Sequence, residues 1–274
     1  MNYPKSFIDL IKKCQQNYPG TYIGTGNPEG KILIIGKECA IDSVSNHAQY
    51  VREIVNNLRD WLNNLPSALN PIGTQFNDVD VWVNPTKVPP TYNPLYPYKG
   101  QKHIIRREYK NGKISNPDGT CQTWFNYQSL YNIIIGKNTG NIDFHEDCFI
   151  TELSQETAKY SHHKAKESRA NINARQWIFT EDFFLKFPIT IFACSKNYIG
   201  KLKGGIQSVI GSRWVLLPNN HNMKGLYDIY VDNNTNQILI ITRQLSMNFD
   251  KNLIPTIASI CKPYFKTSVR KLIY

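Results

Sequence analysis

Charged side chains stand where four short apolar segments of the sequence end. The four segments cover residues 31–36, 148–153, 189–194 and 238–242. Glu38 follows the first segment, Glu152 closes the apolar run of the second, and Arg243 follows the fourth. A carboxylate can orient a water molecule as a general base or stabilise a developing cation, and an arginine can stabilise an anion. These segment ends are therefore the candidate site for hydrolytic chemistry.

The elements that must position these side chains are strands and helices in alternation. Each apolar segment is rich in β-branched residues and is typical of a strand buried on both faces of a parallel sheet. Between these four segments lie stretches whose apolar residues recur at helical spacing, and shorter strands are expected beside the four central ones. The expected helices cover residues 4–16, 47–64, 122–135 and 247–265, with further helical stretches around 164–186 and 197–209, and the extra strands cover 78–83, 214–218 and 227–231.

This order predicts one α/β domain over residues 1–274, with a three-layer α/β/α architecture around a central four-stranded parallel sheet. The carboxyl ends of parallel strands lie at one edge of the sheet, where ligands of such folds bind. We therefore expect the side chains at the four strand ends to meet. Strand ends are commonly polar without any function, which explains serine and asparagine there better than it explains two glutamates.

A basic insertion interrupts this order at about residues 84–121. It contains six prolines, and its second half, residues 98–113, holds six Lys and Arg against one Glu. Irregular segments of this length within a compact domain are usually functional or mobile.

The net charge of the chain is +11, from 32 Lys and Arg against 21 Asp and Glu. Such a surplus suits a polyanionic partner, most often a nucleic acid. The candidates for contacts with a phosphate backbone lie in two groups, Arg106, Arg107 and Lys110 in the insertion, and Lys196, Lys201 and Lys203 after the third apolar strand. The alternative is that each basic run is simply a solvated face.

Several classes of protein are excluded or disfavoured. The six cysteines include no C-x-x-C pair, which argues against a zinc ribbon and favours reduced thiols in the cytoplasm. The apolar runs are far shorter than the roughly 20 residues of a membrane span, and the first residues do not resemble a signal peptide. We expect a cytoplasmic monomer with no metal, no cofactor and no membrane association.

The order of elements and the strand-end motifs resemble the uracil-DNA glycosylase superfamily. In that family one active-site motif follows the first strand and another follows the last. The matching stretches here are Gly36-Lys37-Glu38-Cys39 and Thr242-Arg243-Gln244-Leu245-Ser246. The proline that typically follows the acid of the first motif and the histidine that precedes Leu-Ser in the last motif are both replaced.

The resemblance implies hydrolysis of the N-glycosidic bond of a damaged or deaminated base in DNA. Glu38 would activate water and Arg243 would stabilise the leaving base, whereas Leu245 would fill the stack that the base vacates. The base-binding residues would be Gly36, Lys37, Cys39, Glu152, Ser195, Gln244 and Ser246. As an ionised carboxylate Glu152 only accepts hydrogen bonds, which favours a base with an amino group such as cytosine.

Each of these roles has a structural alternative. Glu38 could be a helix-terminal or ion-paired acid, Glu152 an acid at the edge of the core, Arg243 a phosphate contact and Leu245 an ordinary core residue. For the whole chain the alternatives are a non-catalytic nucleic-acid-binding relative, motivated by the replaced histidine and proline, or an α/β enzyme that acts on a nucleotide or another small anion.

Overall fold

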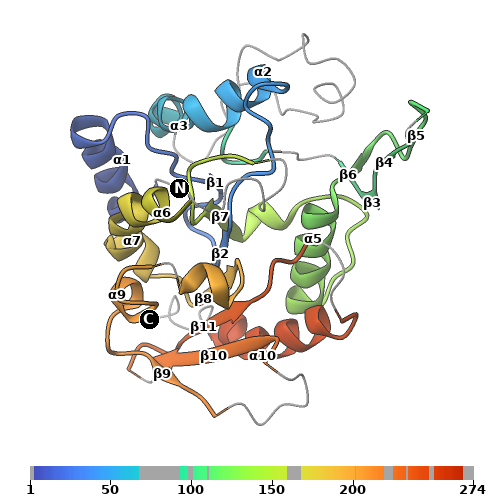
Figure 1. The fold of residues 1–274 in the computed structure, drawn as a ribbon. Coiled ribbons are helices and arrows are strands. Elements are labelled where there is room, and N and C mark those ends of the chain that lie inside the picture. The colour runs from blue at the N-terminus through green and yellow to red at the C-terminus, as the bar shows by residue number, and fades with distance from the viewer. Residues whose placement is uncertain are drawn as a thin grey trace.

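The fold is built on one mixed β-sheet. The computed structural model describes residues 3–67, 93–97, 101–109, 111–158, 168–200, 202–218, 225–232, 234–246 and 250–267. In this part of the chain the sheet has seven strands in the order β1-β7-β2-β8-β11-β10-β9 (Figure 1). The strands are β1 (Thr25–Gly26), β2 (Ile32–Gly36), β7 (Cys148–Glu152), β8 (Ile189–Ala193), β9 (Val215–Leu216), β10 (Tyr227–Asp232) and β11 (Gln237–Thr242).

The four long apolar segments of the sequence form the parallel centre of this sheet. Strand β2 pairs in parallel with β7 on one side and with β8 on the other, and β8 pairs in parallel with β11. Side chains of β2 alternate between the two faces, so that Leu33 and Ile35 join one apolar cluster and Ile32 and Ile34 join the other. Burial on both faces explains why these strands are continuous apolar runs.

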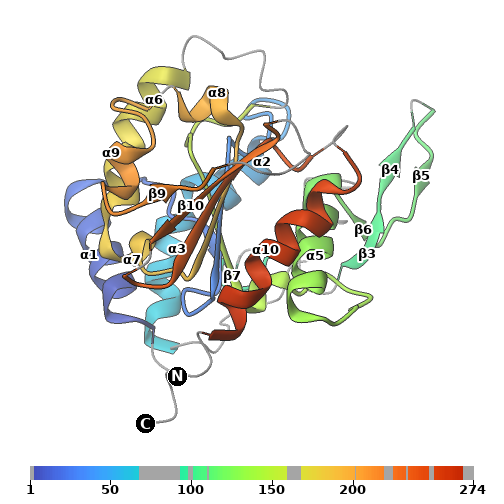
Figure 2. The same ribbon diagram turned by 90° about the horizontal axis from the view of Figure 1, so that it is seen from below.

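Helices cover both faces of the sheet (Figure 2). One face packs against α1 (Lys5–Asn17), α3 (Asn57–Asn64), α6 (Ser168–Arg175), the 3₁₀ segment η5 (Gln176–Thr180), α7 (Asp182–Leu185) and α9 (Gln207–Ile210). The other face packs against α5 (Gln122–Ile135) and α10 (Leu253–Thr267). On the first face the rings of Phe7, Trp61, Phe149 and Phe183 contact one another edge to face or tilted. Aromatic stacking of this kind adds to the burial energy of the core.

The expected helix over residues 47–64 is interrupted. It consists of α2 (His47–Tyr50), the π-helical turn η1 (Val51–Val55) and α3. Each hydrogen bond in a π-helix spans five residues instead of the four of an α-helix. The spacing of apolar residues in the sequence does not reveal this change. The shorter helical segments α8 (Lys196–Ile199), η2 (Leu65–Ser67) and η3 (Phe144–Glu146) complete the described helices.

The described part of the insertion is less irregular than expected. Strand β3 (Lys102–Ile105) pairs with β6 (Gly119–Thr120), and β4 (Arg107–Glu108) pairs with β5 (Ile114–Ser115). These short strands form an arm that projects beyond α5 (Figures 1 and 2). The rest of the insertion before residue 93, and the strand expected at 78–83, lie outside the described residues.

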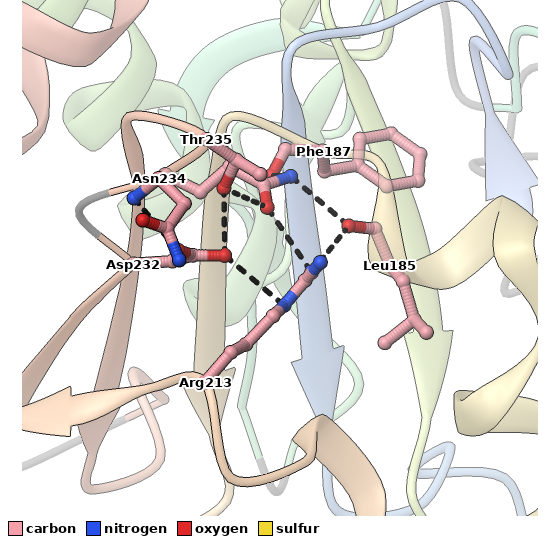
Figure 3. Close-up of polar contacts among 7 residues, drawn as sticks. Leu185, Phe187, Arg213, Asp232, Asn234 and Thr235 are labelled. Atoms are coloured by element: carbon pink, nitrogen blue, oxygen red, sulfur yellow. Dashed lines mark hydrogen bonds and ion pairs between the residues drawn. The ribbon is translucent and has the colours of Figure 1, made fainter.

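A polar network around the buried side chains of Asp232 and Gln237 closes the end of the sheet opposite the candidate site (Figure 3). Arg213 Nε lies 3.1 Å from Asp232 Oδ2, and Thr235 Oγ1 donates to the same oxygen at 2.8 Å. Gln237 Nε2 donates to the main-chain oxygen of Leu185 at 3.0 Å, and Arg213 donates there as well. The network therefore ties the β10–β11 turn to the segment that precedes β8.

The expectation of an α/β fold is confirmed, but the expected four-stranded parallel sheet was wrong in extent. The sheet is mixed because β10 folds back on β11 as a hairpin, β9 pairs with β10, and β1 pairs antiparallel with β7. The segments expected as extra strands at 214–218 and 227–231 supply β9 and β10. In the described part of the chain, no helix has both the length and the apolar character needed to cross a membrane.

Candidate functional site

The strand order predicts a ligand crevice at the carboxyl ends of β2 and β8. Of the parallel strands, the first in the chain, β2, lies between the second, β7, and the third, β8. The chain therefore leaves β2 toward one edge of the sheet and leaves β8 toward the other. In doubly wound sheets ligands bind at such a switch point, outside the carboxyl ends of the two strands. The residues after Gly36 and after Ala193 border this position.

Glu38 and Tyr198 join the two sides of the crevice. Glu38 lies in the loop after β2, and Tyr198 lies in α8, which follows β8. The hydroxyl of Tyr198 donates to Glu38 Oε2 at 3.0 Å, and the Lys37 ammonium lies 4.9 Å from the centroid of the Tyr198 ring. Glu38 is half-buried, and the hydrogen bond from Tyr198 holds its carboxyl group in place. This geometry suits a carboxylate that orients a water molecule.

Glu152 lies beside Glu38 because β7 pairs in register with β2. Gly36 and Glu152 are partners in the parallel ladder, and the Glu152 carboxyl group packs over the glycine. A Cβ atom on residue 36 would overlap Oε2 of Glu152 and lie 2.8 Å from its Cδ and 2.9 Å from its Oε1. Glycine at position 36 therefore makes the space that the carboxyl group occupies.

Arg175 approaches Glu152 from α6 but binds the main chain of β7. Its Nε donates to the Glu152 carbonyl oxygen and its Nη2 donates to Thr151 Oγ1, each at 3.0 Å. Arg175 is only 5% exposed, and burial lowers the pKa of its guanidinium to about 10. Within the described residues, neither Arg175 Nη1 nor Glu152 Oε2 has a hydrogen-bond partner, although both atoms are buried.

The two glutamates of the site differ in their electrostatic surroundings. Burial, and next the negative charge of Glu38, raise the pKa of Glu152 to about 8, and the charge of Arg175 opposes this shift only in part. Both effects favour the protonated form of the Glu152 carboxyl group. Carboxyl groups that differ in this way commonly divide the acid and base roles of an active site.

Cys39 forms a wall of the site together with the π-helical turn. Burial, and next the charges of Glu152 and Glu53, raise the pKa of the Cys39 thiol well above its ordinary value, although a hydrogen bond with Tyr22 opposes the shift. Glu53 lies in η1, where it is ion-paired with Arg52 and buried. Because a cysteine attacks as its thiolate, Cys39 is poorly suited to be a nucleophile here.

Ser195 connects the crevice to the end of β11 through a strained turn. It is not a glycine, yet its φ is 71° and its ψ is 151°. Its N–H donates to the Thr242 carbonyl oxygen at 2.8 Å, which places Arg243 next to this turn. Such backbone conformations cost on the order of 1–3 kcal/mol and tend to occur at functional sites.

Arg243 is exposed, and Gln244 and Ser246 are half-buried.

Leu245 is fully buried in the apolar cluster of β11, α5 and α10, and its carbonyl oxygen accepts a hydrogen bond from Asn126 at 2.9 Å. It packs as a core residue in this structure, so insertion into DNA, the role expected for it, would require it to leave the core. The structure thus agrees with the structural alternative for this position.

The residues expected to contact a phosphate backbone fall in two separate places. Lys196 is exposed near the crevice and forms an ion pair of 2.6 Å with Asp228, and Lys203 is exposed beyond α8. Arg106 and Arg107 lie on the projecting arm, half-buried and exposed respectively. Lys110 and Lys201 lie outside the described residues. The structure therefore does not gather all of these cations around the crevice.

Two residues at the site were missed by the sequence analysis. Tyr198 carries a weak signal, since it follows the third strand within the first turn of a helix. Arg175 carries no signal, because no local pattern in the sequence indicates that it turns inward. Among the described residues, no group of three or more His, Cys, Asp or Glu side chains could hold a metal ion.

In comparisons with known proteins, no family model, no curated protein and no solved structure matches this chain. The function is therefore inferred from the site itself. Its defining feature is a pair of glutamates in unlike environments, Glu38 and Glu152, at the crevice between strands of a parallel array.

Proposed function

We propose that this chain is a DNA glycosylase-like hydrolase on a three-layer α/β/α fold similar to that of the uracil-DNA glycosylases. It would cleave the bond between a damaged or deaminated base and its deoxyribose. The observation that carries the proposal is the hydrogen bond of Glu38 with Tyr198 across the carboxyl ends of β2 and β8, with Glu152 beside it. The order β7-β2-β8-β11 supports it, since this order creates a ligand crevice at that point.

In the proposed reaction Glu38 acts on water. Its carboxylate accepts a hydrogen bond from a water molecule and directs that molecule at C1′ of the sugar. As the N–C1′ bond breaks, its electron pair leaves with the base, and positive charge develops on the sugar, where the Glu38 carboxylate stabilises it. The water oxygen bonds to C1′ and its proton passes to Glu38. Tyr198 is a positioning residue, because it acts through the carboxylate that it holds.

The basic residues of the rim would serve the leaving base and the DNA backbone. Arg243 stands beside the Ser195 turn, where an always-charged guanidinium can stabilise the departing base or bind a phosphate. Lys196 is exposed near the crevice and Lys203 is exposed beyond α8, and the net charge of +11 favours DNA over an uncharged partner. The remaining proposed base contacts are Gly36, Lys37, Cys39, Gln244 and Ser246. Cytoplasmic location, a monomeric state and independence of cofactors stay predictions.

The test is an excision assay with end-labelled oligonucleotides, single- and double-stranded, that carry uracil, hypoxanthine, xanthine or an alkylated base. Alkali then cleaves the strand wherever a base was removed. Glu38→Gln removes the general base and is expected to lower the rate by about 10²–10⁴-fold. Glu29→Gln is the matched control, because Glu29 is exposed just before the opposite end of β2.

Three results would contradict the proposal. Full activity of Glu38→Gln would remove Glu38 from the mechanism. Salt-sensitive DNA binding without excision of any base would identify a non-catalytic nucleic-acid-binding protein instead. Absence of DNA binding at moderate salt would exclude both, and would favour an enzyme that acts on a nucleotide or another small anion.

A further inference from the structure

Titratable side chains from several elements surround the Glu152 carboxyl group. None of them makes a hydrogen bond that would stabilise a negative charge on its buried oxygen. These groups are Glu38 and Cys39 after β2, Tyr127 in α5, Arg175 in α6 and Cys194 after β8. The one cation among them directs Nε and Nη2 to the main chain and hydroxyl group of β7. Oε2 of Glu152 is buried and has no hydrogen-bond partner within the described residues.

A second negative charge is unfavourable at this position. Glu38 lies in the loop that follows the glycine over which Glu152 packs, and its charge acts on Glu152. Two carboxylates that share a partly dry site cannot both ionise easily, so one of them keeps its proton. Glu38 is half-buried and accepts a hydrogen bond from the hydroxyl group of Tyr198, whereas Oε2 of Glu152 is buried and has no such donor within the described residues. Of the two carboxyl groups, Glu152 is therefore the one expected to keep its proton.

We infer that Glu152 turns away from its place over Gly36 when a base binds and contacts that base as a neutral carboxylic acid, which donates one hydrogen bond through its hydroxyl group and accepts one through its carbonyl oxygen. The site would then select a base edge that offers one donor beside one acceptor, such as the N–H and C=O of uracil or hypoxanthine. It would disfavour an edge with two adjacent donors, such as N1–H and N2–H₂ of guanine, which pairs better with an ionised carboxylate. This inference rests on the proposed function, since it assumes that a base occupies the crevice.

The inference reverses the expectation from sequence that Glu152 only accepts hydrogen bonds. It also predicts the direction of the pH dependence. With a pKa of about 8, Glu152 loses its donor at alkaline pH, so excision should fall by about tenfold for each pH unit above that value. A carboxylate that worked in its ionised form would give activity that rises over the same range.

The first experiment measures protonation without substrate. Infrared difference spectra of the wild-type protein minus Glu152→Gln are recorded as a pH titration. The expected result is the carbonyl stretch of a protonated carboxylic acid at neutral pH, lost as the pH rises past about 8. Absence of this band at neutral pH overturns the inference, whatever the excision assay shows.

The second experiment measures excision of uracil and hypoxanthine between pH 6 and pH 10 by the wild-type protein, Glu152→Gln and Glu152→Ala. Glutamine keeps one donor and one acceptor and cannot ionise. It should retain activity within about tenfold at pH 7 and lose the alkaline decline, whereas alanine should lose activity throughout. Glu29→Gln should keep the wild-type profile.

The outcomes separate the inference from the proposed function. If Glu152→Gln is folded but inactive at every pH while the wild-type protein is active, the neutral donor–acceptor role is wrong and the glycosylase proposal stands. A rise of wild-type activity with pH would likewise show that the neutral role of Glu152 is wrong while the glycosylase proposal stands. If the band titrates as expected but no base is excised or bound, the glycosylase proposal fails, and the inferred base selectivity is overturned with it.

Discussion

Replacement of Gly36 by alanine is expected to move the Glu152 carboxyl group without unfolding the protein. The new Cβ would overlap Oε2 of Glu152 and lie 2.8 Å from its Cδ, whereas carbon atoms in contact are about 3.5–4.0 Å apart. The atoms in the way are the far end of a flexible side chain. We therefore expect the carboxyl group to move by about 1 Å while the strand stays in place.

Stability should change little in this variant. Gly36 does not have a left-handed backbone, so alanine can adopt its conformation without strain. Gly→Ala at a compatible position restricts the unfolded chain and is worth about 0.4–1 kcal/mol of stability, which offsets part of the cost of crowding. Activity should fall much further, because a displacement of about 1 Å at a reacting site can cost about 10²-fold in rate.

The assay pairs single-turnover excision with thermal unfolding for the wild-type protein, Gly36→Ala and the control Gly140→Ala. A Cβ on residue 140 meets no atom within 4 Å, so the control adds a methyl group in open space; it should leave activity unchanged and raise stability by no more than about 1 kcal/mol. Unchanged excision by Gly36→Ala would refute a role for the Glu152 position. Loss of the folded state would show that the strand, and not the carboxyl group, absorbs the clash.

Three further predictions concern stability. Because folding raises the pKa of Glu152 from 4.5 to about 8, the wild-type protein should lose stability relative to Glu152→Gln as the pH rises between these values, by a few kcal/mol, roughly, in denaturant titrations; parallel curves would contradict the shift. His145 is buried against the rings of Trp124 and Phe144, and burial lowers its pKa from 6.5 to about 3, so stability should fall as the pH drops below 6.5, and His145→Phe should reduce that loss. Chemical denaturation at pH 7 and pH 5 measures this, and equal acid sensitivity of both proteins would exclude it. Asp232→Ala should lower the free energy of unfolding by about 2 kcal/mol, since it removes the buried carboxylate that accepts hydrogen bonds from Thr235 and the main chain of Asn234 and pairs with Arg213 in Figure 3; a change below about 0.5 kcal/mol in urea denaturation would mean that the network adds little.

The parallel centre of the sheet could be predicted because its signal is local. Residues 31–36, 148–153, 189–194 and 238–242 are apolar without alternation, and only strands buried on both faces require this pattern. The full extent of the sheet could not be predicted in the same way. Whether a short segment such as 215–216 pairs with a neighbour depends on hydrogen bonds to a strand elsewhere in the chain.

The candidate site was predicted in outline and not in its working parts. The rule that strand ends of a parallel array share one edge was enough to bring Glu38 and Glu152 together. The contacts of Tyr198 and Arg175 depend on where α8 and α6 pack, which no spacing in the sequence specifies. Leu245 shows the same limit, because its burial follows from the packing of α5 and α10 on β11.

By itself the sequence determined the α/β class, the four central strands, the excess of positive charge and the two glutamates at the strand ends. Only the tertiary structure decided the surroundings that raise the pKa of Glu152. The pKa of a carboxyl group depends on its hydration and on the charges within a few ångströms. For Glu152 these are set by Gly36, Glu38 and Arg175, which lie far from it in the sequence and reach it only through the pairing of β2 with β7 and the packing of α6.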